Sequence, residues 1–572
     1  MATRGTTSSF MTFSLLAFLL LHGCVAQLEL PQSGWWHNLR EQQQHRLRAK
    51  TDCRVQRIDA REPEQRYEFE GGYVEYWDGN NEESECAGIR FVRHVIQPGG
   101  LLLPHYANAP QLVYVVQGNG VQGVVIPGCA ETFESGESSE GRREGGPRWE
   151  SERGRGEGGR RWESERGQSE GGRRWEGGEG GSQRDRHQKL RRIRQGDVLA
   201  LPQGVTRWTY NDGDSELVTV SILDVANDNN QLDLNFRKFF LAGNPSSSGR
   251  QEGRREGRQE GRHEGRRFGG REERSDEWRN IFSGFDEELL ADAFNVDNQL
   301  IRRLQSQDDN RGFIVKAERL NLVLPEYSRE EREEEFRHGG GRREQEWRHG
   351  GTRREQERRH GGTRREQEWR HGGGRDSSNG LEETFCTLKL HQSIDNPERA
   401  DIFNPRAGRI STVNSQTLPV LSYLRLNAER GILYRNALTA PKYSANAHSA
   451  LYVTRGNARI QVVGNEGNAV FDGEVREGQL LIIPQNFAVV KRASEEGFEW
   501  INFQTNDNAF NTKLAGRLSA IRSIPADVLA NAYDISREEA LKLKYNRRES
   551  TLFSSESSEE GRYRPRDAEA KA

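Results

Sequence analysis

Three charged, repetitive segments divide this chain and restrict what the rest of it can fold into. They run from about 134 to 188, from about 245 to 274 and from 329 to 378, and Arg, Glu and Gly dominate them. Such segments bury too little apolar surface to offset the entropy of ordering, and paired glycines disfavour a sustained helix. We therefore expect three long disordered Arg/Glu/Gly-rich inserts, so any core must come from the sequence between them.

The remaining sequence forms two similar halves with strand-like patterns. Short Val, Ile, Leu and Tyr runs alternate with Gly, Pro and Asn, which is typical of an antiparallel β-barrel or jelly roll. Each half ends in helical sequence, 286–294 in the first and 525–533 with 536–541 in the second. The expected strands are 111–116, 121–126, 197–201 and 217–223 in the first half and 450–453, 458–463, 479–483 and 499–503 in the second.

The N-terminus and the cysteines indicate a secreted protein. Residues 1–26 have the pattern of a signal peptide, with an apolar core at 10–21 and a predicted cut between Ala26 and Gln27. That core is shorter than the roughly 20 residues that a membrane span needs. The cysteines that remain are even in number, which favours disulfides and leaves three pairings open: Cys53, Cys86, Cys129 and Cys386.

Charge and motifs argue against several classes of function. The net charge is −3, with 84 basic and 87 acidic residues, so we expect no nucleic-acid or membrane partner. Arg and Glu alternate in the inserts, which weakens any binding driven by counterion release. The repeated histidines of the third insert could bind metal only loosely, because flexible spacing fixes no geometry. No nucleophile, phosphate-loop or zinc motif occurs, so the sequence predicts no catalytic residues and no cofactor.

Gly99, Gly118, Gly196 and Pro202 in the first half, and Gly456, Gly478 and Pro484 in the second, stand at the spacing of a metal-binding cupin motif. Both halves therefore resemble cupins, in which three His and one Glu hold a divalent metal. In the first half the aligned ligand positions carry His105, Ala107, Gln111 and Arg207. In the second half they carry Lys442, Ser444, Ser449 and Val489. Of these eight positions, only His105 carries the residue that binds metal in the cupin motif. The resemblance therefore implies a mainly β bicupin without a metal site and without cupin enzyme activity. A non-enzymatic cupin that binds a ligand or carbohydrate in a pocket remains the alternative.

A second resemblance concerns the border between the third insert and the second half. The run Asn379-Gly380-Leu381-Glu382-Glu383-Thr384-Phe385-Cys386 resembles the processing site of legumin-type 11S/13S globulins, the seed storage proteins. A flexible border of this kind also favours proteolysis on physical grounds. Similar stretches occur at 229–233, 237–245, 404–410 and 514–517. The resemblance covers nearly all of the chain outside the inserts, and 13S globulins with tandem repeats are the most similar subgroup.

This resemblance implies a complete processing route. An asparaginyl endopeptidase would cut between Asn379 and Gly380, giving an acidic chain, 27–379, and a basic chain, 380–572. Disulfides would join Cys53 to Cys86 within the acidic chain and Cys129 to Cys386 between the chains. The proform would be a homotrimer and the processed protein a hexamer, moving from the endoplasmic reticulum to the protein storage vacuole of seeds.

Composition supports a nutrient reservoir for nitrogen and amino acids. Of the 84 basic residues 73 are Arg, which carries three side-chain nitrogens. The expected domains are a signal peptide at 1–26, a first cupin domain at 27–328, an insert at 329–378, a second cupin domain at 380–548 and a flexible tail at 549–572.

Overall fold

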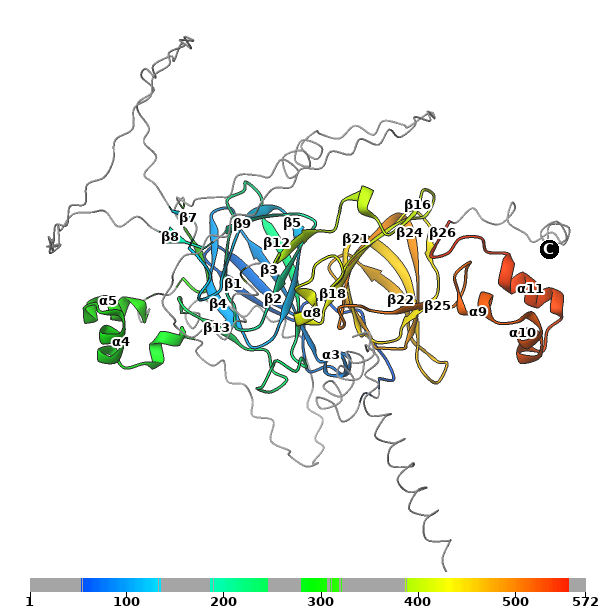
Figure 1. Cartoon of the computed structure of the whole chain (residues 1–572), viewed down its shortest axis with the longest axis horizontal. Coiled ribbons are helices and arrows are strands. Elements are labelled where there is room, and N and C mark those ends of the chain that lie inside the picture. Colours follow the sequence, from blue (N-terminus) through cyan, green and yellow to red (C-terminus); the bar gives the residue numbers. More distant parts are fainter. Residues whose placement is uncertain are drawn as a thin grey trace, which may run out of the picture.

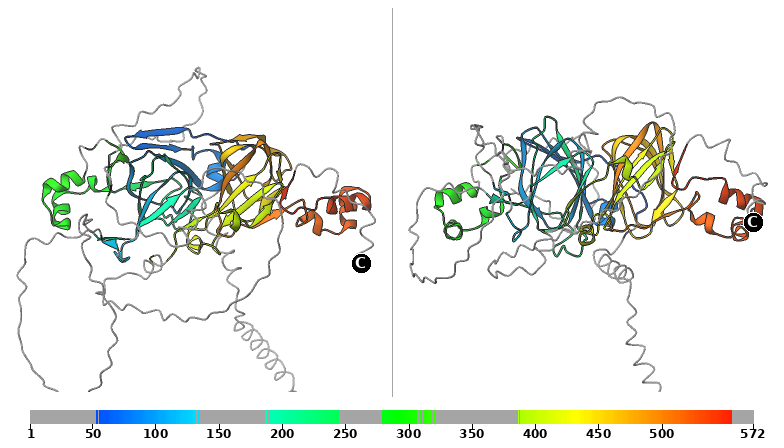
Figure 2. Two further views of the ribbon diagram at one scale, coloured as in Figure 1. Left: turned by 90° about the horizontal axis from the view of Figure 1, so that it is seen from above. Right: turned by 45° about the horizontal axis from the view of Figure 1, so that its top comes forward.

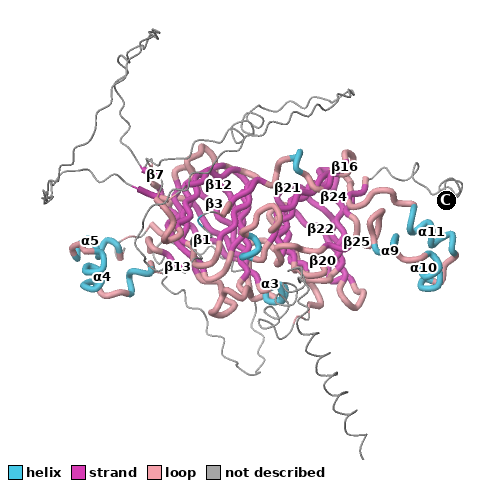
Figure 3. The backbone as a smooth tube through the Cα atoms, in the orientation of Figure 1, coloured by secondary structure: helices cyan, strands magenta, loops and turns pink. Residues whose placement is uncertain are grey.

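Two antiparallel β-barrels lie side by side at the centre of the molecule, with a small group of helices at each outer end (Figure 1). The computed structural model describes residues 53, 55–131, 133–134, 186–188, 190–244, 279–305, 309, 311–317, 320, 386 and 388–554. Strands fill the two barrels in Figure 3, and the views of Figure 2 place the helical groups at opposite ends as well. The mainly β bicupin with helical extensions is therefore confirmed.

Two sheets build the first barrel. The seven-stranded sheet has the order β1 (Gln65–Phe69), β2 (Gly72–Tyr76), β3 (Ile89–Ile96), β12 (Leu217–Asp224), β5 (Gln111–Gln117), β10 (Asp197–Leu201), β15 (His391–Ser393). The six-stranded sheet has the order β13 (Lys238–Phe240), β4 (Gly100–Ala107), β11 (Thr206–Tyr210), β6 (Asn119–Val125), β9 (Leu190–Arg194), and β14 (Ile314–Lys316) also pairs with β4.

One large sheet curls into the second barrel. Its strands are β16 (Ile402–Asn404), β17 (Gly408–Val413), β18 (Asn427–Leu433), β19 (Leu438–Thr439), β20 (Lys442–Ser444), β21 (Ser449–Val463), β22 (Ala469–Arg476), β23 (Leu480–Ile483), β24 (Ala488–Gln504), β25 (Asn511–Lys513) and β26 (Leu552–Phe553). The runs 450–453 and 458–463, expected as separate strands, are parts of one strand, β21, which keeps pairing with β24 across two register shifts.

Apolar side chains join the two barrels into one body. A continuous cluster of buried residues runs from β3, β5 and β12 of the first barrel to Ile501 and Phe503 on β24 of the second. Phe91 stacks on Tyr452 with ring centroids 5.7 Å apart, and Arg93 Nη1 donates to the Tyr452 hydroxyl at 3.1 Å. A second cluster fills the second barrel around Trp500. Burial of this apolar surface is the main stabilising term for the paired barrels.

The first helical extension contains two α-helices after a 3-10 turn, and the second contains three α-helices. The first has the turn η1 (Ile281–Gly284), α4 (Glu287–Phe294) and α5 (Asn298–Leu304), and the second has α9 (Ala520–Ser523), α10 (Ala526–Tyr533) and α11 (Arg537–Tyr545). The side chains of Asp286, Asp297 and Ser536 accept bonds from the first free N–H groups of α4, α5 and α11. The expected helices are therefore confirmed.

Three short elements complete the description: α3 (Glu82–Ala87), η2 (Pro397–Arg399) and α8 (Leu421–Leu424). None of the helices in the described ranges is long and apolar enough to cross a bilayer.

The two barrels do not follow the expected domain boundaries, because each contains a strand or segment from the other half of the sequence. Strand β15 comes from beyond Asn379, yet it pairs with β10 at the edge of the first barrel. In the other direction Val55 and Ile58 join the core cluster of the second barrel, and Arg61 pairs with Leu480. Each barrel therefore takes a segment from the other half, an exchange that local apolar patterns cannot predict because the pairing is long-range.

Two further boundaries differ from the expectation. The segment from 549 was expected to be a flexible tail, but β26 pairs with β19 and both Leu552 and Phe553 are buried. The insert expected at 134–188 has ordered ends, because β7 (Phe133–Glu134) pairs with β8 (Arg186–His187). The interior of that insert, and the segments 245–274 and 329–378, lie outside the described residues.

Candidate functional site

The four cysteines that the structure describes form two disulfides. Cys53 pairs with Cys86, with Cα atoms 5.0 Å apart, and Cys129 pairs with Cys386, with Cα atoms 5.5 Å apart. Cys86 lies in the last turn of α3 and is buried in the core cluster of the second barrel. The second disulfide joins residues 257 positions apart in the sequence, so it links the two halves across the segment that contains Asn379.

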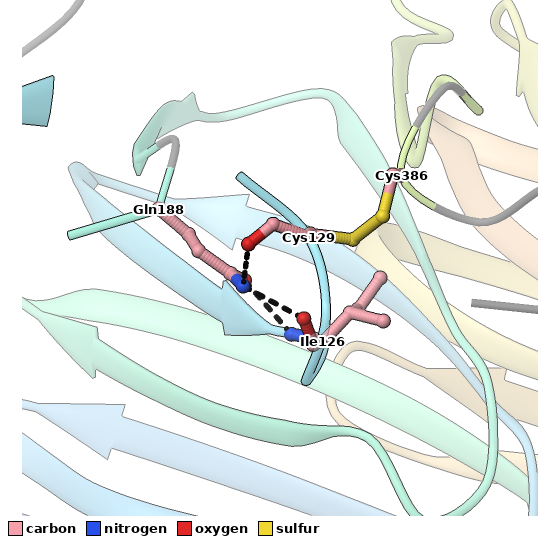
Figure 4. Close-up of a disulfide and its surroundings, with 4 residues drawn as sticks. All are labelled: Ile126, Cys129, Gln188 and Cys386. Carbon is pink, nitrogen blue, oxygen red and sulfur yellow. Dashed lines mark hydrogen bonds between the residues drawn. A yellow bond between two sulfur atoms is a disulfide. The ribbon is translucent and has the colours of Figure 1, made fainter. Parts of the chain in front are cut away.

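Gln188 holds the loop that presents Cys129 (Figure 4). Its side-chain amide donates to the carbonyl oxygens of Ile126 at 2.7 Å and Cys129 at 2.9 Å, and its oxygen accepts from the Ile126 N–H at 2.9 Å. Three bonds from one side chain fix the turn after β6. The sequence did not predict this role, because the expected first insert included Gln188.

The residues that follow Cys386 are tightly held by the first barrel. The Leu390 carbonyl accepts from Ala200 N and Ile394 N donates to the Gly196 carbonyl, both at 2.8 Å. Leu390 and Ile394 are both buried in the core. Asp395 then accepts from the Tyr114 hydroxyl at 3.1 Å and from Arg430 Nε at 3.0 Å, so one carboxylate connects both barrels. The predicted cleavage residues Asn379 and Gly380, and Ala26 and Gln27 at the signal cut, lie outside the described residues.

Inside the first barrel, the aligned cupin ligand positions form no metal site. His105 is fully buried, and its Nδ1–H donates to the Leu103 carbonyl at 2.8 Å. Its Nε2 accepts from Arg207 Nε at 3.1 Å, which leaves no lone pair for a metal. Ala107 has no donor atom, and Gln111 lies on β5 in the opposite sheet. No group of three or more His, Cys, Asp or Glu suited to a metal occurs among the described residues.

Sequence reasoning missed two further members of this interior cluster. Lys238 on β13 donates to the Tyr76 hydroxyl at 3.2 Å and lies 3.1 Å from His94 Nε2. The alternation of Lys238 with Phe240, whose strand partner is His105, was the available signal, since alternate residues of a strand share one face.

The electrostatics of this cluster are set by burial and by its own positive charges. Burial, followed by Arg207 and Lys238, lowers the pKa of His105 well below its usual value. Burial, followed by Lys238, Arg207 and His105, does the same to the pKa of His94. Burial alone lowers the pKa of Arg207 to about 9, so Arg207 keeps its charge at neutral pH. Burial and then Arg207 lower the pKa of Lys238 well below its usual value.

The second barrel has a different interior. Lys442 Nζ donates to Glu429 Oε2 at 2.8 Å, and both residues are buried. Lys491 lies with Nζ 4.5 Å from the centre of the Trp500 ring. Burial, assisted by Lys442, lowers the pKa of Lys491 to about 7, against a smaller opposing effect of Glu429.

The other three positions of the second barrel that align with cupin metal ligands are Ser444, Ser449 and Val489. Ser449 accepts from the Gln504 amide at 3.3 Å, Ser444 lies beside Lys442 on β20, and Val489 is the strand partner of Lys442. An internal ion pair has thus replaced the ligand set.

Comparisons with known proteins agree with this geometry. A family model described as Cupin matches residues 58–247 and 392–541. The 11S globulin seed storage protein 1 of Carya illinoinensis is 50% identical over 551 residues, which cover 95% of each chain. The crystal structure of pumpkin seed globulin is 40% identical with a TM-score of 0.64, covering 88% of this chain and 100% of that one. The recombinant pro-11S globulin of pumpkin is 40% identical with a TM-score of 0.62, covering 88% and 99%.

Proposed function

The chain belongs to the 11S/13S seed storage globulins of the cupin family, and we propose that it is a nitrogen reservoir cut after Asn379 into two linked chains. The observation that carries the storage function is the 50% identity with a seed storage globulin over 95% of both chains. The Arg-rich inserts fit this role, because their sequence can expand without changing the cores.

Measurement of the protein in maturing and germinating seeds tests the storage function. We expect the amount to rise during maturation and to fall on germination, with peptides of the inserts lost before those of the barrels. A constant amount throughout germination would contradict a reservoir. We further propose that the protein reaches the storage vacuole through the secretory pathway, which immunogold labelling of seed sections would test.

The processing proposal rests on the position of Asn379 between two structurally anchored segments. Cys386 is bonded to Cys129, and β15 pairs with β10, so a cut seven residues before Cys386 leaves both products attached. Treatment of the proform with asparaginyl endopeptidase should give one band without reductant and two bands with it. N-terminal sequencing of the smaller product should begin at Gly380, and any other start would contradict the assignment.

We propose that the proform assembles as a trimer through its helical extensions. Each extension exposes at least half of the surface of two apolar residues. These are Leu289 (66%) and Phe294 (50%) on α4, and Val528 (53%) and Leu543 (55%) on α10 and α11. The two extensions lie at opposite ends (Figure 1), so head-to-tail contacts between copies can close a ring. Light scattering should give a trimer before cleavage and a hexamer afterwards, and a monomer would contradict the proposal.

We also infer that the chain is not an enzyme. The interior positions that bind metal in other cupins hold the His105–Arg207 pair in one barrel and the Lys442–Glu429 pair in the other. In the first pair the His105 Nε2 lone pair is taken by Arg207, and in the second the Lys442 amine is held in an ion pair by Glu429. A screen of the purified protein with divalent metals should therefore show no stoichiometric binding of the metal to the barrels.

A further inference from the structure

The interior of the first barrel brings together four basic side chains from its two facing sheets. His105, Arg207 and Lys238 lie on neighbouring strands of the six-stranded sheet, and the registers Arg207–His105 and Phe240–His105 place them on one face. His94 comes from β3 in the opposite sheet, where its strand partner is Val74 of β2. Tyr76 is two residues after Val74 and therefore lies on the same face as His94. The bonds from Lys238 to His94 and Tyr76 cross the gap between the sheets.

This cluster contains no compensating acid. Among the described residues, no carboxylate forms a hydrogen bond or an ion pair with His94, His105, Lys238 or Arg207, and the charges that act on them are those of one another. The second barrel offers an internal comparison, since there Lys442 is paired with Glu429 at 2.8 Å. A buried cation without a carboxylate beside it is costly, and the charge of Arg207 in the first barrel is in that position.

The donors of the cluster are also incompletely used. The Arg207 side chain is 6% exposed, and the one hydrogen bond that the described residues give its guanidinium runs from Nε to His105. Its two terminal nitrogens remain as a fork of the kind that binds an oxyanion. Lys238 as a residue is half-buried, and its amine lies within the cluster, against Tyr76 and His94.

We propose that this cluster binds one small oxyanion, such as inorganic phosphate, through Arg207 and Lys238. The oxyanion supplies the negative charge that Glu429 supplies in the second barrel. The two neutral imidazoles add polar contacts, with His105 holding Arg207 and His94 holding Lys238. This binding role goes beyond storage and does not depend on cleavage at Asn379.

Equilibrium dialysis with labelled inorganic phosphate tests the proposal, at pH 6.5 and at ionic strength held constant with chloride. The full-length proform should bind one phosphate per chain. Arg207→Met and Lys238→Met should each weaken binding at least tenfold. Arg192→Met is the matched control, because it removes the same charge from the same barrel but from a surface ion pair with Asp212 at 2.9 Å. Its binding should equal that of the wild type.

Two results would overturn the proposal. One is the absence of saturable binding to the wild-type protein. The other is equal affinity in the wild type and in whichever of Arg207→Met and Lys238→Met folds, judged by circular dichroism. The two substitutions lie on different strands, β11 and β13, so the failure of one to fold leaves the other as the test.

Discussion

Lys491 lies inside the second barrel with 2% of its surface exposed, close to a second amine, Lys442, and over the ring of Trp500. Its pKa is lowered from 10.5 to about 7, mainly by burial. The unfolded chain therefore holds this proton more tightly than the folded chain does. The resulting cost to folding is complete below pH 7 and disappears as the pH rises toward 10.5.

Lys491→Met should accordingly raise the stability of the protein in acid. The expected gain at pH 5 is about 5 kcal/mol, since the pKa falls from 10.5 to about 7 and each pKa unit corresponds to roughly 1.4 kcal/mol, and it should shrink above pH 7. Urea denaturation at pH 5, 7 and 9 measures it, with exposed Lys542→Met as the control. A gain that is the same at all three pH values would show that charge burial is not the cause.

Gly456 and Gly467 offer a matched pair for backbone effects in the second barrel. Both have a positive φ, +71° and +77°, which strains any other residue. A Cβ at Gly456 would lie 2.3 Å from the Gly497 carbonyl oxygen, whereas one at Gly467 meets nothing within 4 Å.

Gly456→Ala should therefore lower the thermal midpoint clearly more than Gly467→Ala does. Strain alone costs about 1–3 kcal/mol and applies to both substitutions, while the steric clash applies to Gly456 only. Differential scanning calorimetry of both variants gives the comparison. Equal midpoints would mean that β24 moves away from β21 without cost.

At the level of single elements, helix α11 depends on its capping box. Ser536 Oγ accepts from the Glu539 N–H at 3.2 Å, and Glu539 Oε2 accepts from the Ser536 N–H at 2.9 Å. Ser536→Ala should destabilise this helix by about 1 kcal/mol. Hydrogen exchange of the amides in 537–545 should quicken, while amides of β21 stay unchanged. Ser536→Thr keeps the cap and should have little effect.

The sequence predicted individual strands and helices better than it predicted how the strands pair. Apolar runs and flanking turns predicted β10 at 197–201 with the observed bounds, and apolar spacing predicted α4 and α10 within a residue. The same runs split β21 in two, because Gly456 interrupts the apolar pattern although it lies at a register shift within one paired strand. Partners of a strand are set by contacts distant in sequence, so β15 in the first barrel could not be predicted.

The interior clusters were predicted only in part for a similar reason. Alignment to cupin ligands located His105 and Arg207, which do meet, but it carries no information on Lys238 or His94. Those two enter through strands β13 and β3, which the motif does not cover. Gln111, also located by the alignment, has no bond to His105 or Arg207 among the described residues, since it lies in the opposite sheet.

At the scale of the whole molecule, the exchange of segments between barrels should hold a cleaved protein together without its disulfide. Cys129→Ser with Cys386→Ser removes the covalent link, but β15 still pairs with β10 and Val55 and Ile58 still pack in the second core. After cleavage the two chains of this variant should co-elute on a native sizing column and separate on a denaturing gel without reductant. Separate native peaks would show that the disulfide is required.

The short ladder of β7 and β8 has a consequence for how this molecule can change over evolutionary time. Phe133 pairs with His187 and Glu134 with Arg186, so both ends of the first repeat segment emerge from one fixed point. Duplicating the repeats between them adds only a closure term that grows with the logarithm of length, about 0.6 kcal/mol per doubling. Whole repeats can therefore be added between β7 and β8, which raises the nitrogen content of the seed protein while the two barrels stay the same.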